Sequence, residues 1–236
     1  MKNMRSVLTL ILTLTFVVSP FLTSPFTGFT ADQLPIPQID PPIQPAGYAF
    51  AIWGLIYAWL VVSAVYGVWK HPRDPRWDHA RTPLIASLAV GTPWLAVANQ
   101  SAIWATIFIF VMLITAIMAL LRTPNDRWTF QVPVGLYAGW LTAASFVSLG
   151  STAAGYGLLT DQLGWAYIGI IAAMVVALTT MRHSRRPAYG LAVVWALVGI
   201  VVANGTAPLG VSILAGIGAV VLLGLSVASS GHSVPS

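Results

Sequence analysis

The chain has 236 residues, of which 57% are hydrophobic and only 7% are charged, and its formal net charge is +5. Soluble domains carry about 25% charged residues, so the composition excludes an ordinary water-soluble protein. The absence of cysteine excludes disulfides, thiol nucleophiles and thiolate metal sites. No alternating ten-residue segments of a membrane β-barrel are evident. We therefore predict an all-α polytopic membrane protein.

Eight apolar segments are long enough to cross a hydrocarbon core of about 30 Å. In chain order they are residues 7–27, 46–69, 82–99, 101–121, 132–152, 163–181, 188–204 and 207–228. The first has the basic start and apolar centre of a signal peptide. It offers no clean small-x-small cleavage site, so we predict that it is retained as a membrane helix.

The basic residues sort to one side of these spans. All eleven Lys and Arg lie in the N-terminal tail and in every second loop, at 70–81, 122–131 and 182–187, and loop 28–45 holds none. Lys and Arg accumulate on the cytoplasmic side of membrane proteins. The pattern predicts eight passes with both termini in the cytoplasm, in a bacterial cytoplasmic (inner) membrane. The positive net charge is therefore explained by membrane topology and by contact with anionic lipids, and it does not indicate a nucleic-acid-binding surface.

Ionisable residues are confined to the loops and span edges. All six acidic residues are aspartates in loops, and there is no glutamate. Ion-coupled transport and hydrolysis within the membrane usually need buried ionisable groups. We therefore predict no catalytic residue and no enzyme. His71, Asp74, Asp78 and His79 are metal-ligand types, but the surrounding prolines and arginines favour a solvated basic loop, so no metal site is predicted.

The ten tryptophans fall into two groups. Five at span ends are typical of an interfacial belt: Trp69, Trp77, Trp104, Trp128 and Trp165. Other rings share helix faces with small residues in the outer half of three spans: Phe50, Trp53, Tyr57, Trp94, Tyr137 and Trp140, with Ala144. Large rings beside small residues would form a slot for a flat apolar ligand. Ordinary helix packing gives the same spacing, so both interpretations stand.

Loop 28–45 is the only long outer segment, and it carries five prolines. Proline fixes φ and disfavours regular structure, which makes the loop stiff. Such a loop is either a lid over the outer mouth of the bundle or a solvated connector, and the sequence does not separate these alternatives.

Three stretches resemble the translocator protein family, also called tryptophan-rich sensory protein (TspO/MBR). "PPIQPAGYAFAIWGLIY" is similar to its proline-rich lead into the second helix, "GTPWLAVAN" to its third-helix segment and "LYAGWLTAASF" to its fifth-helix signature. The resemblance covers about residues 1–157. It implies a TspO-like five-helix bundle with 28–45 as its lid loop, and it leaves residues 158–236 as a C-terminal extension of three helices.

The resemblance also implies a pocket under the first loop for tetrapyrroles, sterol-like or isoquinoline-like molecules. By match, the pocket would be lined by Trp53, Tyr57, Trp94, Trp140 and Ala144. With Phe50 and Tyr137 on the same faces, these are our predicted ligand-binding residues. Gly91 and Ser148 stand where the family has asparagines, and Leu136 where it has a proline. No outer cation is present for porphyrin carboxylates, which favours a less anionic ligand.

The predicted function is that of a sensory or binding membrane protein for an apolar planar ligand. No resident cofactor is predicted, although the resemblance implies a porphyrin- or haem-type ligand. A small-molecule transporter or permease, and a structural subunit of a membrane complex, remain as alternatives. The expected partners are the ligand, the bilayer and a second copy or another membrane protein. Gly135 and Gly139 form a GxxxG, a common helix-interface pattern that also occurs by chance.

Overall fold

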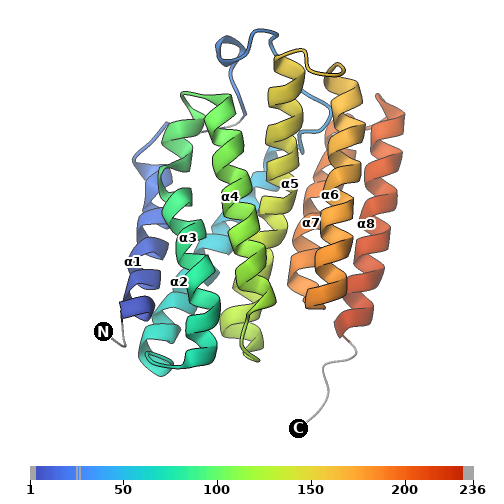
Figure 1. The fold of residues 1–236 in the computed structure, drawn as a ribbon. Helices are drawn as coiled ribbons and strands as arrows, with labels where there is room; N and C mark the ends of the chain where they lie inside the picture. The colour runs from blue at the N-terminus through green and yellow to red at the C-terminus, as the bar shows by residue number, and fades with distance from the viewer. Residues whose placement is uncertain (1–3, 25, 27, 231–236) are drawn as a thin grey trace.

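The computed structural model describes residues 4–24, 26 and 28–230, and within them the chain forms eight α-helices and no strand (Figure 1). The helices are α1 (Met4–Val18), α2 (Ile52–Lys70), α3 (Pro75–Ala98), α4 (Ala102–Leu121), α5 (Val132–Gly155), α6 (Gln162–Ser184), α7 (Pro187–Asn204) and α8 (Leu209–Ser230). A single-turn π-helix, Arg127–Gln131, leads into α5, and a 3₁₀ segment, Gly47–Ala51, leads into α2. The predicted all-α fold is confirmed.

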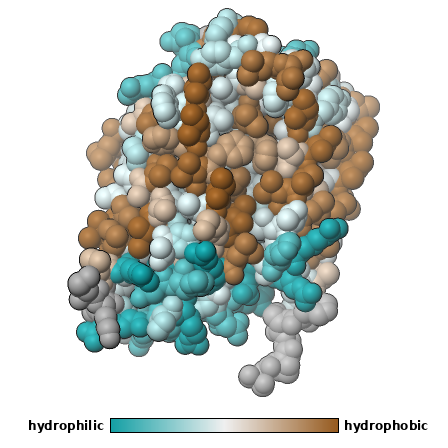
Figure 2. Space-filling model, viewed as in Figure 1, coloured by the Kyte–Doolittle hydropathy of each residue, from teal (hydrophilic) through white to brown (hydrophobic). Residues whose placement is uncertain are grey.

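The helices lie side by side, and the start of α1 and the end of α8 lie at the same end of the bundle (Figure 1). We call this the basic end, because the basic loops lie there, and the opposite end the loop end, because residues 28–45 cover it. Hydrophobic side chains form a broad band between the two ends, and hydrophilic side chains gather at the basic end (Figure 2). This arrangement agrees with the alternation of charge along the sequence.

Seven of the helices are long and apolar enough to cross a membrane, and α3 is the exception. Its first two turns carry polar and charged side chains, including Arg76, Asp78 and Arg81, which lower its mean hydropathy. It nevertheless lies alongside α1 and α4 through the bundle (Figure 1). The predicted eight helices are therefore all present, and α3 is the one whose composition alone does not identify a span.

The start of α3 corrects the predicted loop 70–81. Asp74 caps the helix, because its Oδ1 accepts the Arg76 backbone N–H at 2.9 Å, and Pro75 occupies the first helical turn, where its missing N–H costs nothing. Only residues 71–74 connect α2 to α3. Asp78, His79 and Arg81, which we predicted to lie in a loop, are therefore in a helix.

The first helix is shorter than the predicted span 7–27. It ends at Val18, and Pro20 then lies in a 3₁₀ turn, Ser19–Phe21. Residues 25 and 27 of that predicted span lie outside the described part of the chain. The helix packs against α2 and α3, and Phe16 is only 4% exposed. It is thus an integral wall of the bundle.

Helix α5 forms the centre of the molecule. Nearly all of its residues are buried, and it packs against α2, α4, α6 and α7. A Cβ added at Gly139 would overlap the backbone oxygen of Tyr189 in α7, and one at Gly135 would lie 3.1 Å from the Tyr189 nitrogen. The GxxxG is therefore used inside the chain, where it lets α5 and α7 approach closely. One continuous core joins residues on both sides of position 157.

The proline-rich loop is packed against the bundle rather than solvated along its length. Leu34 and Ile43 are 5% and 2% exposed. The Ile36 N–H donates to the Gly155 carbonyl at 2.8 Å, and the Gln33 side chain donates to the Ala98 carbonyl at 2.8 Å. Other side chains of the loop are exposed, among them Ile36 at 50% and Ile39 at 71%, so the lid and the solvated connector both stay predictions.

Candidate ligand-binding site

A cavity of about 240 Å³ lies near the loop end, between α1 to α5 and the proline-rich loop. Its walls are aromatic and aliphatic, with a few hydroxyl and amide groups. No Asp, Lys, Arg or His of the described residues lines it. The lining residues used below are Phe16, Phe26, Phe29, Pro45, Phe50, Trp53, Tyr57, Gly91, Trp94, Trp140, Ala143, Ala144, Ser148 and Ser151. The cavity is thus suited to an uncharged apolar molecule.

Phe16 of α1 sits at the centre of the aromatic wall. Its ring meets those of Trp53, Tyr57 and Tyr137 edge-on, at centroid distances of 5.9, 5.4 and 5.7 Å. Trp53 and Tyr57, one helical turn apart on α2, stack at 5.1 Å. Such pairs favour edge-to-face or offset geometry, so these rings hold each other in fixed orientations. The result is a preformed aromatic surface from three helices.

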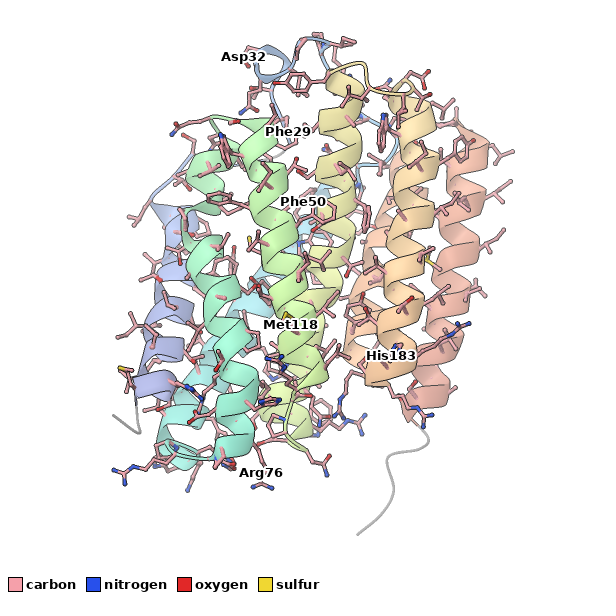
Figure 3. The ribbon with its side chains drawn as sticks, viewed as in Figure 1. Phe29, Asp32, Phe50, Arg76, Met118 and His183 are labelled. Carbon is pink, nitrogen blue, oxygen red and sulfur yellow. The ribbon has the colours of Figure 1, made fainter. Side chains whose placement is uncertain are left out.

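The first loop and α3 close the cavity at the loop end. Phe26 contacts Phe29 at 5.6 Å and Trp94 at 5.4 Å, both edge-on. Trp94 is fixed in turn, because its Nε1–H donates to the Ala105 carbonyl of α4 at 2.9 Å. Phe29 lies at the top of the molecule, whereas Phe50 lies deeper between the helices (Figure 3). The cavity therefore has an aromatic roof as well as aromatic walls.

Trp140 of α5 is the unusual polar group of the site. Its side chain is 2% exposed and lines the cavity, and its ring meets those of Phe50 and Trp53 at 5.7 and 6.3 Å. Its buried Nε1–H has no acceptor among the described residues. A buried donor without a partner is costly, and each such group in a native structure needs an explanation.

Ser148 belongs to a cluster of buried hydroxyl groups beside the cavity. Its Oγ lies 2.7 Å from Thr106 Oγ1, which lies 2.9 Å from Thr152 Oγ1. Thr106 also donates to the Ala102 carbonyl of its own helix at 2.8 Å. This hydroxyl network ties α4 to α5, and the loss of a polar anchor for the ligand at this position stays a prediction.

Six of the seven predicted ligand-binding residues line the cavity: Phe50, Trp53, Tyr57, Trp94, Trp140 and Ala144. Tyr137 is the seventh, and it lies behind the wall. It is fully buried, its hydroxyl lies 2.9 Å from the Ser87 Oγ, and its ring supports Phe16. Trp140 and Ala144 therefore line the cavity from the helix face that the spacing predicted. The Tyr137 ring supports the cavity wall from behind.

Sequence reasoning missed the residues that α1 and the first loop contribute. Phe16 is the only aromatic residue of α1, and this was the available signal that the helix has a special face. Phe26, Phe29 and Pro45 lie outside regular helix, so helical periodicity could not place them.

Of the five tryptophans predicted to form an interfacial belt, three are exposed and two are buried. Trp69, Trp104 and Trp128 are 72%, 57% and 60% exposed. Trp77 and Trp165 are buried instead, at 2% and 8%. Trp77 is buried because α3 begins earlier than predicted and turns this ring inward against Phe130, at 4.5 Å. The Trp165 Nε1–H donates to the Leu158 carbonyl at 2.6 Å.

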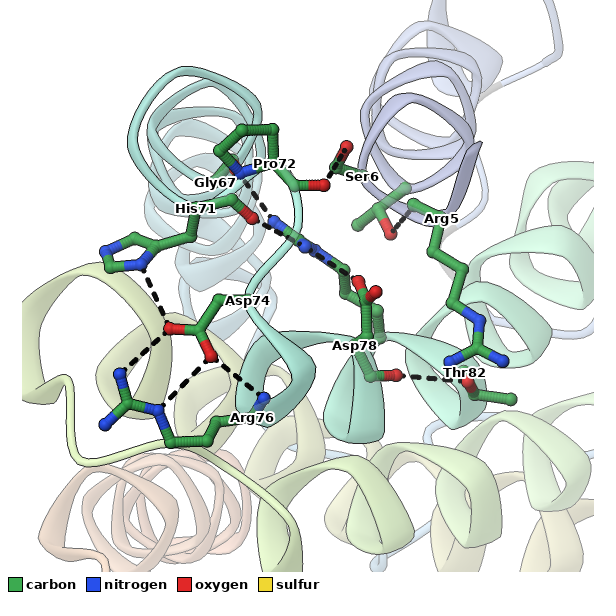
Figure 4. Close-up of polar contacts among 11 residues, drawn as sticks. Arg5, Ser6, Gly67, His71, Pro72, Asp74, Arg76, Asp78 and Thr82 are labelled. Carbon is green, nitrogen blue, oxygen red and sulfur yellow. Dashed lines mark hydrogen bonds and ion pairs between the residues drawn. The ribbon is translucent and has the colours of Figure 1, made fainter. Parts of the chain in front are cut away.

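The acidic and histidine residues of the basic end bind basic groups and backbone atoms (Figure 4). Asp74 contacts Arg76 at 3.0 Å and His71 at 3.3 Å, and hydrogen bonding from Arg76 lowers the pKa of Asp74 below its usual 3.8. Asp78 pairs with Arg81 at 2.9 Å. The described part of the chain contains no group of three or more His, Cys, Asp or Glu arranged to hold a metal ion.

Comparison with known proteins gives one match. The family model described as TSPO-like protein matches residues 5–228. No curated protein and no solved structure matches the chain. The matched range includes the five helices around the cavity and also α6, α7 and most of α8, so the family match extends beyond residues 1–157, to which the resemblance in the sequence was limited. The chain therefore belongs to the TSPO-like protein family, and it is an integral multi-pass membrane protein.

Proposed function

We propose that this protein binds an uncharged, planar, apolar ligand in the cavity at the loop end and acts as a membrane sensory or binding protein. The observation that supports this most strongly is the cavity itself, whose walls are mostly aromatic and aliphatic and carry no charged side chain among the described residues. Trp140 is one of the lining residues, and its buried Nε1–H has no acceptor among the described residues. A ligand with a carbonyl or aromatic nitrogen would supply that acceptor. Aromatic walls with few polar groups are typical of small-molecule sites.

The size of the cavity narrows the ligand class. Small-molecule pockets typically enclose about 300–1,000 Å³, and this cavity is slightly smaller, at about 240 Å³. A molecule of two or three fused rings fits this space, whereas a whole tetrapyrrole requires the roof or the side chains to move outward. Because no cation lines the cavity, the ligand gains nothing from carrying carboxylates.

The proposed orientation follows from the charges. The basic end would face the cytoplasm, as the positive-inside rule implies, and the cavity would lie in the outer half of the bilayer. Apolar ligands partition into bilayers, so a cavity at this depth would bind ligand molecules from the membrane as well as from the outer solution.

Protoporphyrin and its dimethyl ester form a matched pair of probes, because they share the macrocycle and differ in charge. We expect both to quench tryptophan fluorescence in purified protein, with the ester binding at least as tightly as the acid. Trp53→Ala and Trp140→Phe should weaken binding of both probes. Trp104→Phe, which alters an exposed ring on α4, should leave it unchanged.

Two outcomes would reject the proposal. One is the absence of saturable quenching by either probe and by a smaller tricyclic aromatic ketone. The other is quenching with the same affinity in Trp53→Ala, Trp140→Phe and wild type. Trp140→Phe keeps an aromatic ring in the wall but removes the N–H together with part of the indole, so a loss of affinity confined to ligands that carry an acceptor is the result that would identify the hydrogen bond.

A further inference from the structure

The wall of the cavity formed by Pro45 and Phe50 has α7 directly behind it. Pro45 and Phe50 line the cavity. A Cβ built on Gly199 of α7 would lie 2.9 Å from the Cβ of Pro45 and 3.0 Å from that of Ala49. The glycine therefore allows the backbone of this segment to lie against the helix. A side chain at Gly199 would therefore press on Pro45, which lines the cavity, and on Ala49.

Three hydrogen bonds join the same segment to α7. The Ala46 N–H donates to the Gly199 carbonyl at 3.0 Å. In the other direction, the Trp195 Nε1–H donates to the Ala49 carbonyl at 2.8 Å. The Asn204 Nδ2–H donates to the Pro42 carbonyl at 2.8 Å. These contacts are spread over residues 42–49, so they fix both the position and the register of the segment. The Trp195 ring also meets Tyr48 edge-on at 5.7 Å.

The composition of the segment explains why it needs an external partner. Pro41, Pro42 and Pro45 have no backbone N–H to donate. The segment therefore forms only a turn, in which the Gln44 N–H donates to the Pro41 carbonyl at 2.8 Å, and the short 3₁₀ helix Gly47–Ala51. Buried backbone carbonyls nevertheless require donors. The side chains of Trp195 and Asn204 supply two of them from α7.

We propose that α7 is a positioning element of the ligand site and that Trp195, Gly199 and Asn204 set the shape of its wall without touching the ligand. This assigns a role to part of the three-helix extension. Ligand affinity then depends on α7, and an occupied cavity presses on α7 through Pro45. The ligand half of this inference rests on the proposed function, whereas the positioning of residues 42–49 by α7 stands independently of it.

Gly199→Ala tests the proposal, with Gly224→Ala of α8 as the matched control. A Cβ at Gly224 meets no atom within 4 Å. We expect Gly199→Ala to weaken binding of protoporphyrin dimethyl ester by about 10-fold or more, and Trp195→Phe by about 2- to 10-fold, the range of a lost hydrogen bond. Gly224→Ala should bind as wild type does. Equal affinities in all four proteins would overturn the proposal for the ligand site.

Amide hydrogen exchange provides a readout that needs no ligand. In wild type and the same variants, we expect exchange in residues 43–51 to quicken in Gly199→Ala and Trp195→Phe, while exchange in the central α5 and the melting temperature in detergent change little. If the wild type binds no probe, the proposed function fails and exchange alone decides the positioning role. Unchanged exchange in residues 43–51 in both variants would overturn that role, whatever the ligand result.

Discussion

The two ends of the bundle are built from the same helices but are packed very differently. At the loop end, α1 to α5 and the first loop enclose a cavity of about 240 Å³, whereas the cavity between α1, α2, α3 and the π-helix Arg127–Gln131 at the basic end measures only about 10 Å³. At the loop end, aromatic rings face small residues such as Gly91, Ala143 and Ala144. At the basic end, Trp77 and Phe130 interlock at 4.5 Å. The cavity is thus a local consequence of small residues opposite fixed rings.

The basic end is closed by a buried arginine. Arg81 is 2% exposed, and its guanidinium donates to the Gly67 carbonyl at 2.8 Å, to the His71 carbonyl at 2.9 Å and to Asp78 at 2.9 Å. A Cβ at Gly67 would lie 2.8 Å from this guanidinium, so α2 provides room for it only because that residue is glycine. Arg81 and its partners therefore fill the space between α2 and the start of α3 at the basic end.

The largest expected effect is a loss of stability when the buried arginine of the basic end is removed. Arg81→Ala leaves the Asp78 carboxylate and two backbone carbonyls without their buried partner, which should cost about 3–5 kcal/mol. Arg76→Ala is the control, because Arg76 forms an ion pair with its side chain 77% exposed and should cost at most about 1 kcal/mol. Urea or thermal unfolding in detergent measures both. Equal losses of stability in Arg81→Ala and Arg76→Ala would contradict the claim that the buried Arg81 stabilises the packing of the basic end.

The same substitution at the two ends tests the difference in packing. Ala80→Phe inserts a ring at a fully buried position of the basic end and should destabilise the protein by about 1–3 kcal/mol through overpacking. Ala144→Phe places its ring in the cavity and should cost less, or even stabilise the fold. Melting temperatures of the two variants provide the comparison. If Ala144→Phe proved as damaging as Ala80→Phe, the space at the loop end would not be available to a guest.

The smallest expected effect is a pH dependence at the basic end. Hydrogen bonding from Arg76 lowers the folded-state pKa of Asp74 below 3.8, so its stabilising contribution is present above about pH 4 and is lost as the pH falls through the lowered pKa. Because the pair lies near the surface, we expect less than about 1 kcal/mol. Asp74→Asn keeps a good helix cap and should remove this dependence. An unchanged acid profile in that variant would exclude Asp74 as its source.

The sequence predicted the helices and most of one wall of the cavity, because helical periodicity and charge sorting are local signals. Phe50, Trp53 and Tyr57 share a face at helical spacing, and they line the cavity together. The burial of Trp77 was missed because it depends on where α3 begins, which the Asp74 cap and Pro75 decide. The roof from Phe26 and Phe29 depends on the path of a loop, and the support of Pro45 by α7 depends on contacts between residues about 150 positions apart. No periodic pattern encodes either.

The central claim is that the loop-end cavity is the ligand site, and filling it tests this most directly. Titrating Ala144→Phe with the tricyclic aromatic ketone, which fits the cavity without movement of its walls, beside wild type, measures the affinity of the cavity while the melting temperature reports the fold. We predict that saturable quenching is lost or weakened by at least about 10-fold, a change of 1.4 kcal/mol in binding free energy, with the melting temperature retained. Binding of wild-type affinity by a folded Ala144→Phe protein would contradict the account.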